Sequence, residues 1–192
     1  MAERSGHPAL AKNLVLIGGR GCGKSSVAKR IARANKNFML FSLDALIRYE
    51  AEARTVSQIV GDEGWPGFRA RERAVVEKIA RFEGGALVDT GGGVIADLDA
   101  DGQEVYSAAK VDALRRHGFV IYLERSTRYL ERRTSGDPNR PKLSGTESFG
   151  DIMERRDPWY RRAAHAVLPC QNLSKPEIAE KALELFYQDL GL

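Results

Sequence analysis

The glycine-rich stretch at residues 18–25 constrains the fold of this chain more strongly than any other feature. It reads GGRGCGKS, fits the pattern G-x-x-x-x-G-K-[ST], follows the apolar run LVLI and precedes a helical pattern. Gly19, Gly21 and Gly23 allow backbone conformations closed to residues with a Cβ, so N–H groups can turn toward phosphate oxygens at the helix N-terminus. The sequence therefore predicts a nucleotide-phosphate site between a buried strand and a helix.

The side chains of this loop have separate expected roles. Lys24 would reach the β- and γ-phosphates, and the Ser25 hydroxyl would ligate Mg²⁺. Cys22 has two interpretations, a reactive thiolate and a plain loop residue, and the second is favoured because no His or second thiol is near in sequence. The loop residues expected to contact ATP are Gly19, Arg20, Gly21, Cys22, Gly23, Lys24, Ser25 and Ser26.

The rest of the chain predicts a single α/β domain. Its 192 residues are enough for one sizeable core. Apolar runs rich in β-formers alternate with helix-length segments, the pattern of a parallel sheet covered by helices. Those runs are 13–17, 38–41, 86–88, 119–123 and 166–168. We expect residues 1–12 to form a flexible tail and residues 13–192 to form the domain.

Composition argues against several classes of protein. No apolar run approaches the roughly 20 residues that span a bilayer, and residues 1–13 lack the apolar region of a signal peptide. The net charge of +4 is spread over several segments without interleaved aromatic residues, which favours small anionic substrates over nucleic acid. Cys22 and Cys170 suit a reducing compartment. We expect a cytoplasmic monomer with no membrane or nucleic-acid partner.

A P-loop alone leaves kinases, GTPases and motor ATPases open. Residues 89–92 have the D-x-x-G spacing of GTPases, but Phe38 stands where a guanine-reading N-K-x-D motif needs its Asp. Other segments resemble the shikimate kinase family in order and approximate spacing, over residues 13–190. They are GDEGWPGFRARE (61–72), TGGG (90–93), RRTSGDPNRPKL (132–143) and ERRDPWY (154–160). The segments that contain tryptophan look most like the kinase domain of the fungal pentafunctional shikimate-pathway protein.

The resemblance implies a three-layer αβα P-loop kinase fold with a central parallel sheet of about five strands and a mobile lid. It also implies ATP- and Mg²⁺-dependent phosphorylation of shikimate to 3-phosphoshikimate in aromatic amino-acid (chorismate) biosynthesis, with ATP, ADP and shikimate as ligands. Two alternatives stay open. One is another acid-sugar kinase, such as a gluconate kinase, and the other is a catalytically silent shikimate kinase-like binding protein.

Matched positions give the substrate site that the resemblance implies. Asp44 would hold the shikimate hydroxyls and accept the proton of the attacking oxygen. Arg69 and Arg156 match the pair that grips the substrate carboxylate, for which a bidentate guanidinium is suited. Glu72 matches the supporting acid one helical turn after Arg69.

Other matched positions lie around the nucleotide and the substrate ring. Residues 134–148 match the family's lid, and Arg140 matches its arginine, which closes on the γ-phosphate. Arg133 and Pro176 match the pair that sandwiches adenine. The segment TGGG has two interpretations, a close approach of backbone to the substrate ring and a plain strand-to-helix turn. Its expected substrate contacts are Gly91, Gly92 and Gly93.

The sequence departs from the family in two places. Family members usually carry D-x-D after the second strand, with the first Asp near Mg²⁺, but this chain has Ser42 there. Asp89, after the third apolar run, is the candidate replacement as a metal residue, with a turn-capping carboxylate as the alternative. Residues 97–110 form an insertion whose start mimics a calcium loop. Ala108 stands where that loop needs a bidentate Glu, so we expect a solvated acidic turn before a helix.

Overall fold

The computed structural model describes residues 10–134 and 147–192, and at its centre lies a parallel five-stranded sheet. The strands lie in the order β2, β3, β1, β6, β7. They are β1 (Asn13–Ile17), β2 (Met39–Ser42), β3 (Ala86–Asp89), β6 (Gly118–Glu124) and β7 (Ala166–Pro169). The predicted strands are all present, with ends that differ from the prediction by one residue at most.

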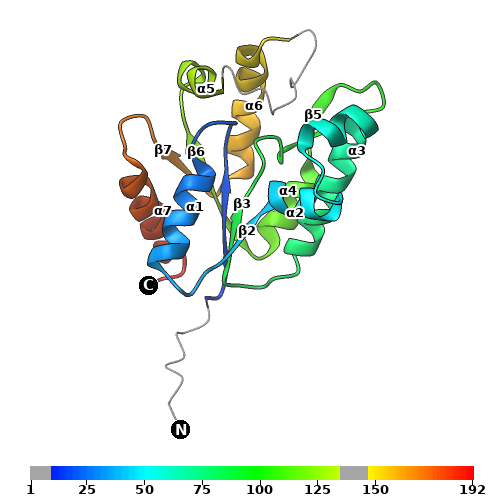
Figure 1. The fold of residues 1–192 in the computed structure, drawn as a ribbon. Helices are drawn as coiled ribbons and strands as arrows, with labels where there is room; N and C mark the ends of the chain where they lie inside the picture. Colours follow the sequence, from blue (N-terminus) through cyan, green and yellow to red (C-terminus); the bar gives the residue numbers. More distant parts are fainter. Residues whose placement is uncertain (1–9, 135–146) are drawn as a thin grey trace.

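Helices cover both faces of this sheet, so the predicted three-layer αβα architecture is confirmed (Figure 1). The helices of the described residues are α1 (Lys24–Ala34), α2 (Leu43–Glu50), α3 (Val56–Ile79), α4 (Ala108–Arg116), α5 (Thr127–Thr134), α6 (Phe149–Ala163) and α7 (Lys175–Asp189). Within residues 10–134 and 147–192, no helix combines the length and the apolar character needed to cross a membrane.

Side-chain alternation along β1 explains the two cores. Leu14 and Leu16 belong to the core beneath α1 and α7, whereas Val15 and Ile17 belong to the core beneath α2, α3 and α4. All five residues of β1 are buried, which is why the strand reads as a continuous apolar run rather than an alternating one.

The two ends of the domain meet beside α7. This helix begins with a capping box, in which the Ser174 side chain accepts a hydrogen bond from the Glu177 N–H, and Pro176 lies in the first turn. Its last turn carries Asp189, whose carboxylate lies 2.8 Å from Lys12 Nζ.

The carboxyl ends of the strands form the edge at which a parallel sheet places its ligands. The register brings the end of β3 between two neighbours: Asp89 pairs with Leu16 of β1 on one side and with Ser42 of β2 on the other. Thr90 Oγ1 also donates a hydrogen bond of 2.8 Å to the Leu16 carbonyl. Asp89 and Ser42 are therefore direct neighbours in the sheet. The acid that this chain has gained thus lies beside the position at which the family's usual Asp is replaced by Ser42.

Helix α3 is bent near this edge. Gly64 has φ 67° and ψ 178°, which are not helical, and Pro66 follows inside the helix. The bend separates the first turns of α3 from the part that carries the buried residues Phe68, Arg69 and Glu72.

The insertion at residues 97–110 folds differently from the expected solvated turn. β4 (Ala96–Leu98) and β5 (Glu104–Tyr106) form an antiparallel hairpin, and α4 follows. Only the tip fits the expectation, where Asp99 Oδ1 accepts hydrogen bonds from the N–H groups of Asp101 and Gln103 at 3.0 and 2.8 Å. Asp97 instead accepts a hydrogen bond from Ser107 and pairs with Arg73. Strand pairing and the ion pair between Asp97 and Arg73 account for the difference, because no local sequence motif indicates either of them.

Candidate active site

The P-loop leads from β1 into α1 with the backbone conformations that its glycines predict. Gly21 and Gly23 have φ values of +86° and +108°, in the region that residues with a Cβ rarely adopt. Gly19 is different, because it lies outside that region and a Cβ there would come within 2.7 Å of Leu130 Cδ1. Close packing against the Leu130 and Met153 side chains, rather than backbone conformation, therefore favours a glycine at position 19.

Lys24 is buried at the start of α1 and bends back over the loop. Its Nζ donates hydrogen bonds to the carbonyl oxygens of Gly18 and Gly19, at 2.7 and 3.2 Å. Burial lowers the pKa of Lys24, but the nearby Cys22 and Tyr160, together with the carboxylates of Asp89 and Asp44, more than offset this and leave the pKa raised. The amine is therefore a fixed positive charge at the centre of the loop.

Asp89 lies next to Ser25 with part of its carboxylate unpartnered. The residue is 6% exposed, and among the described residues its buried Oδ1 has no hydrogen-bond partner. Burial raises the pKa of Asp89, while a hydrogen bond with Ser25 and the charge of Lys24 oppose the rise. An unpartnered carboxylate oxygen beside a P-loop hydroxyl fits Mg²⁺, which typically takes one or two carboxylates together with water and phosphates.

No set of three or more His, Cys, Asp or Glu side chains placed to hold a metal ion occurs within residues 10–134 and 147–192.

Arg69 and Glu72 lie on one face of α3, as their spacing predicts. Arg69 Nη1 donates to Glu72 Oε2 at 2.7 Å and to the Gly93 carbonyl at 3.0 Å. The Arg69 guanidinium also lies 5.4 Å from the ring centroid of Trp65, a cation–π distance. Burial raises the pKa of Glu72, but Arg69 and Lys110 lower it by more, so Glu72 is held as a carboxylate.

Lys110 of α4 completes the pairing of Glu72 from the other side. Its side chain is fully buried, and Nζ donates to Glu72 Oε2 at 2.7 Å and to the Ala96 carbonyl at 2.6 Å. Burial lowers the pKa of Lys110, and Glu72 opposes the change. Two cations thus share one buried carboxylate.

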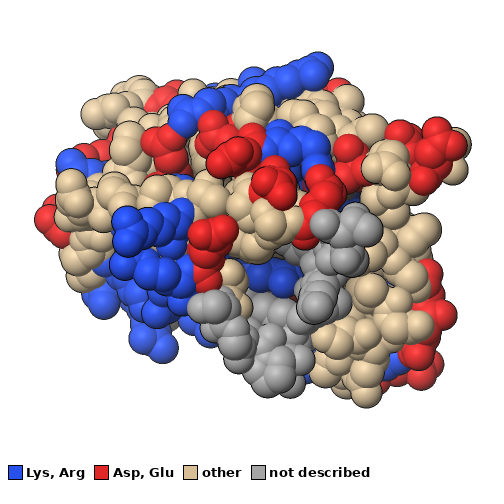
Figure 2. Space-filling view, turned by 90° about the horizontal axis from the view of Figure 1, so that it is seen from above, with Lys and Arg blue, Asp and Glu red and all other residues tan. Residues whose placement is uncertain are grey.

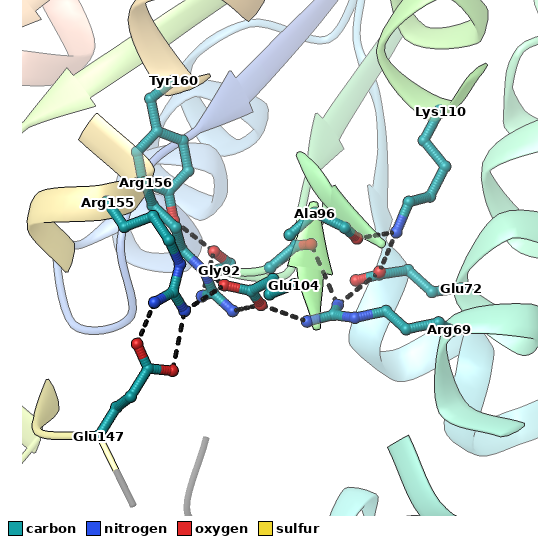
Figure 3. A network of polar contacts seen from close by, with 11 residues as sticks. Arg69, Glu72, Gly92, Ala96, Glu104, Lys110, Glu147, Arg155, Arg156 and Tyr160 are labelled. Carbon is teal, nitrogen blue, oxygen red and sulfur yellow. Dashed lines mark hydrogen bonds and ion pairs between the residues drawn. The ribbon is translucent and has the colours of Figure 1, made fainter. Parts of the chain in front are cut away.

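Glu104 of the hairpin connects this cluster to α6 (Figure 3). Its carboxylate accepts hydrogen bonds from Nε of Arg156, at 2.9 Å, and from Nη2 of the same guanidinium. It also lies 3.5 Å from Arg69 Nη2 and 3.3 Å from Arg155 Nη2, and Arg155 in turn pairs with Glu147. Burial raises the pKa of Glu104, but its bonds to Arg156 more than reverse this, so the pKa is lowered.

The triple glycine is required by the side chains that approach it. A Cβ at Gly93 would lie 2.5 Å from Nη2 of Arg69, and a Cβ at Gly91 would lie 2.8 Å from Oδ1 of Asp44. The Gly92 carbonyl accepts a hydrogen bond from the Tyr160 hydroxyl. These close approaches bring the backbone of the segment next to Asp44 and Arg69.

The P-loop, the triple glycine, Asp44 and the two arginines surround one cavity of about 690 Å³ at the carboxyl edge of the sheet. Figure 2 views this end of the molecule, and Lys and Arg side chains are visible deep in a hollow near its centre. The predicted site residues that line the cavity are Arg20, Gly21, Gly23, Lys24, Ser25, Ser26, Asp44, Arg69, Glu72, Gly91, Gly92, Gly93, Arg133 and Arg156.

The remaining predicted residues lie elsewhere. Gly19, Cys22 and Asp89 lie in or behind the P-loop without lining the cavity, and Pro176 lies at the start of α7. Arg140, with most of the predicted lid, lies outside the described residues.

The shikimate kinase family model matches residues 20–186. The chain belongs to the shikimate kinase family. A shikimate kinase of Leptospira biflexa is 38% identical over 172 residues, which are 90% of this chain and 94% of the relative. The structure of a shikimate kinase from Acinetobacter baumannii in complex with shikimate is similar with a TM-score of 0.78 and 28% identity, over 93% of this chain and 94% of that one.

A gluconokinase from Sinorhizobium meliloti 1021 is also similar in structure, with a TM-score of 0.53 and 21% identity over 94% of each chain. At that identity the likeness shows the fold alone. It therefore gives no support to gluconate as the substrate. Membership of the shikimate kinase family, by contrast, makes ATP the co-substrate.

Sequence reasoning missed several residues of this shikimate kinase site. Glu104 and Lys110 belong to the charge cluster, and the additional lining residues are Arg48, Thr55, Val56, Trp65, Phe68 and Thr90. The burial of Lys110 could have been recognised from the sequence, because this residue lies one turn before Leu114 on the apolar face of α4. Glu104 had none, because its neighbours in the sequence are unlike any phosphate or carboxylate motif.

Proposed function

We propose that this protein transfers the γ-phosphoryl group of ATP to a hydroxyl of shikimate, giving 3-phosphoshikimate and ADP in aromatic amino-acid biosynthesis. One observation carries the proposal: a single cavity joins the P-loop residues Lys24 and Ser25 to Arg69 and Arg156, which come from separate helices. Such a cavity offers a phosphate site and a carboxylate site at the same edge of the sheet. The family membership supports the same reaction.

The reaction follows from the chemistry of these residues. Arg69 and Arg156 bind the substrate carboxylate, which fixes the ring beside Gly91 and Gly93. Asp44 orients one substrate hydroxyl and accepts its proton as the oxygen attacks. A bond forms between that oxygen and the γ-phosphorus while the bond to the β–γ bridging oxygen breaks, and ADP leaves. Lys24 neutralises charge on the phosphoryl group during transfer.

Mg²⁺ is the finer part of the proposal, with Ser25 and Asp89 as the residues that would hold it or its water shell. The bound ion would supply neutralisation of phosphate charge. The unpartnered Oδ1 of Asp89 supports this role, since a buried acceptor without a partner is costly unless a ligand satisfies it.

Several expectations from the sequence remain proposals. They are adenine contacts from Arg133 and Pro176, closure of Arg140 and the 134–148 lid over the γ-phosphate, a monomeric state and a cytoplasmic location.

A coupled assay of the purified protein with ATP, Mg²⁺ and either shikimate or gluconate tests the function. We expect turnover with shikimate and little with gluconate, because Arg69 and Arg156 need a carboxylate placed by a compact ring. Lys24→Ala should lower kcat by about 100-fold or more, which is typical for loss of one charge-stabilising group. Turnover with gluconate alone would support the other kinase. Shikimate binding without turnover would support the silent binding protein.

A further inference from the structure

The edge of Arg156 that could pair with a carboxylate through two hydrogen bonds is already occupied by Glu104 in this structure. Its Nε and Nη2 both bind the Glu104 carboxylate, and Nη1 faces the Gly92 carbonyl at 3.3 Å. Bidentate pairing of this kind is the geometry in which a guanidinium would bind a substrate carboxylate. Glu104 therefore occupies the same edge of Arg156 that the substrate needs.

Arg69 is also paired with carboxylates, although its buried Nε has no hydrogen-bond partner among the described residues. Its Nη1 is held by Glu72 and by the Gly93 carbonyl, while Nη2 lies 3.5 Å from Glu104 Oε1. One carboxylate group thus lies between both arginines, as Figure 3 shows. A substrate acid that bridged Arg69 and Arg156 would take the place where Glu104 now lies.

The hairpin that carries Glu104 is fixed at its base and exposed at its tip. The Ala96 carbonyl accepts a hydrogen bond from Lys110, and the Tyr106 ring lies 4.3 Å from the Arg162 guanidinium. Glu104 is the first residue of β5, next to the exposed turn, and its side chain is 13% exposed against 2% for Arg156. The carboxylate can therefore leave toward solvent by side-chain rotation, without moving the base of the hairpin.

We propose that Glu104 is a built-in competitor of the substrate's carboxylate, which must displace it from Arg156 and Arg69 in order to bind. This inference rests on the proposed function, since it deepens how the acid site selects its substrate. The exchange replaces one carboxylate by another, so the charge of the cluster is unchanged. Weak or poorly shaped anions gain too little to displace Glu104, and an acid that also reaches Asp44 gains more.

Calorimetric titration of shikimate and of its neutral methyl ester into wild type and Glu104→Gln tests this inference. The Gln side chain keeps the size of Glu104 but loses its charge. We expect Glu104→Gln to bind shikimate about tenfold more tightly, the effect of one charged hydrogen bond, and to bind the ester as wild type does. Glu104→Asp, which is too short to reach both arginines, should also bind shikimate more tightly.

Asp101→Asn is the matched control, because it removes one negative charge from the exposed tip of the same hairpin without a contact to either arginine. We expect its shikimate affinity to equal that of wild type. Equal or weaker binding of shikimate by Glu104→Gln, with a folded protein by thermal unfolding, would overturn the inference and make Glu104 a positioning residue. Equal tightening of the acid and the ester would overturn it as well. Failure of the proposed function is distinct, since wild type would then neither bind nor phosphorylate shikimate.

Discussion

The site has two halves, a phosphate half around the P-loop and an acid half around Arg69 and Arg156, which is named for the substrate acid. The two halves hold their charged groups in opposite ways. In the phosphate half, Lys24 is hydrogen-bonded to backbone carbonyls of its own loop, and a buried oxygen of Asp89 has no partner among the described residues. In the acid half, Glu72 is shared by Arg69 and Lys110, and Glu104 is bound by Arg156. The phosphate half therefore keeps a buried carboxylate oxygen without a partner, whereas the buried carboxylates of the acid half are paired with its own cations, although Arg69 Nε has no partner among the described residues.

This difference indicates that the two halves contribute to the stability of the fold to different degrees. A buried group left unpartnered for a ligand does not stabilise the ligand-free protein, because its desolvation cost is not offset until the ligand binds. Buried ion pairs behave otherwise, because removing one partner leaves an uncompensated charge in a medium that solvates it poorly. We therefore expect variants of the acid half to affect folding, and variants of the phosphate half to affect turnover.

The largest expected effect is on stability. Lys110→Met should lower the free energy of unfolding by about 3–5 kcal/mol, because it removes one of the two cations that share the buried Glu72. Lys78→Met is the control, since Lys78 pairs with Glu50 at the surface and its side chain is 57% exposed, so its loss should cost at most about 1 kcal/mol. Urea unfolding measures both. Equal losses of unfolding free energy in the two variants would contradict the stabilising role of the buried ion pairs in the acid half.

A smaller effect is expected on substrate binding. Arg156→Ala should weaken shikimate binding by about 1.5–3 kcal/mol, the size of a lost charged hydrogen-bond partner, with ATP binding nearly kept. Arg161→Ala is a control on the same helix, because Arg161 pairs with Glu124 and Asp157 outside the cavity. Calorimetric titration with each ligand measures the change. Unaltered shikimate affinity in Arg156→Ala would exclude it from the carboxylate site.

The smallest effect is expected at the metal. Asp89→Ala should raise the Mg²⁺ concentration needed for turnover and lower kcat by about 10 to 100-fold, as loss of a partner near a metal typically does. The double variant Ser42→Asp with Asp89→Ala should recover much of the rate, because the two positions are paired across β2 and β3. The rate of turnover, measured as a function of Mg²⁺ concentration, tests this prediction. Urea unfolding of each ligand-free variant shows whether its fold is kept. Wild-type rates at every Mg²⁺ concentration would leave Asp89 as a turn residue.

The phosphate half could be predicted from the sequence because its residues are local. The strand, the loop and the start of α1 form one continuous stretch, so spacing alone predicts that Lys24 and Ser25 lie at the end of β1. The central strands could be predicted for a similar reason, since the burial of β1, β3 and β6 on both faces gives each of them a nearly continuous apolar run.

The acid half could be predicted only in part. Arg69 and Glu72 are one helical turn apart, so their contact follows from helix geometry. Glu104 and Lys110 join them from the hairpin and from α4, and only the packing of these elements brings them together. The acidic residues of the insertion suggested solvation because sequence does not show which of them face an arginine. The ion pairs of the insertion are tertiary contacts, and such contacts leave no pattern in the local sequence from which they could be predicted.

The placement of the tryptophans gives the acid half its own optical reporters. The chain has two tryptophans, and Trp65 lies against the Arg69 guanidinium while the Trp159 ring lies 6.5 Å from Tyr106 at the end of β5. Indole emission responds to nearby charge and to exposure, so one fluorophore monitors an arginine of the acid site and the other monitors the hairpin. Single Trp→Phe variants would separate the two signals. Occupancy of the acid site can then be followed in real time through Trp65 without attaching a label, while a constant Trp159 signal would show that the base of the hairpin stays in place.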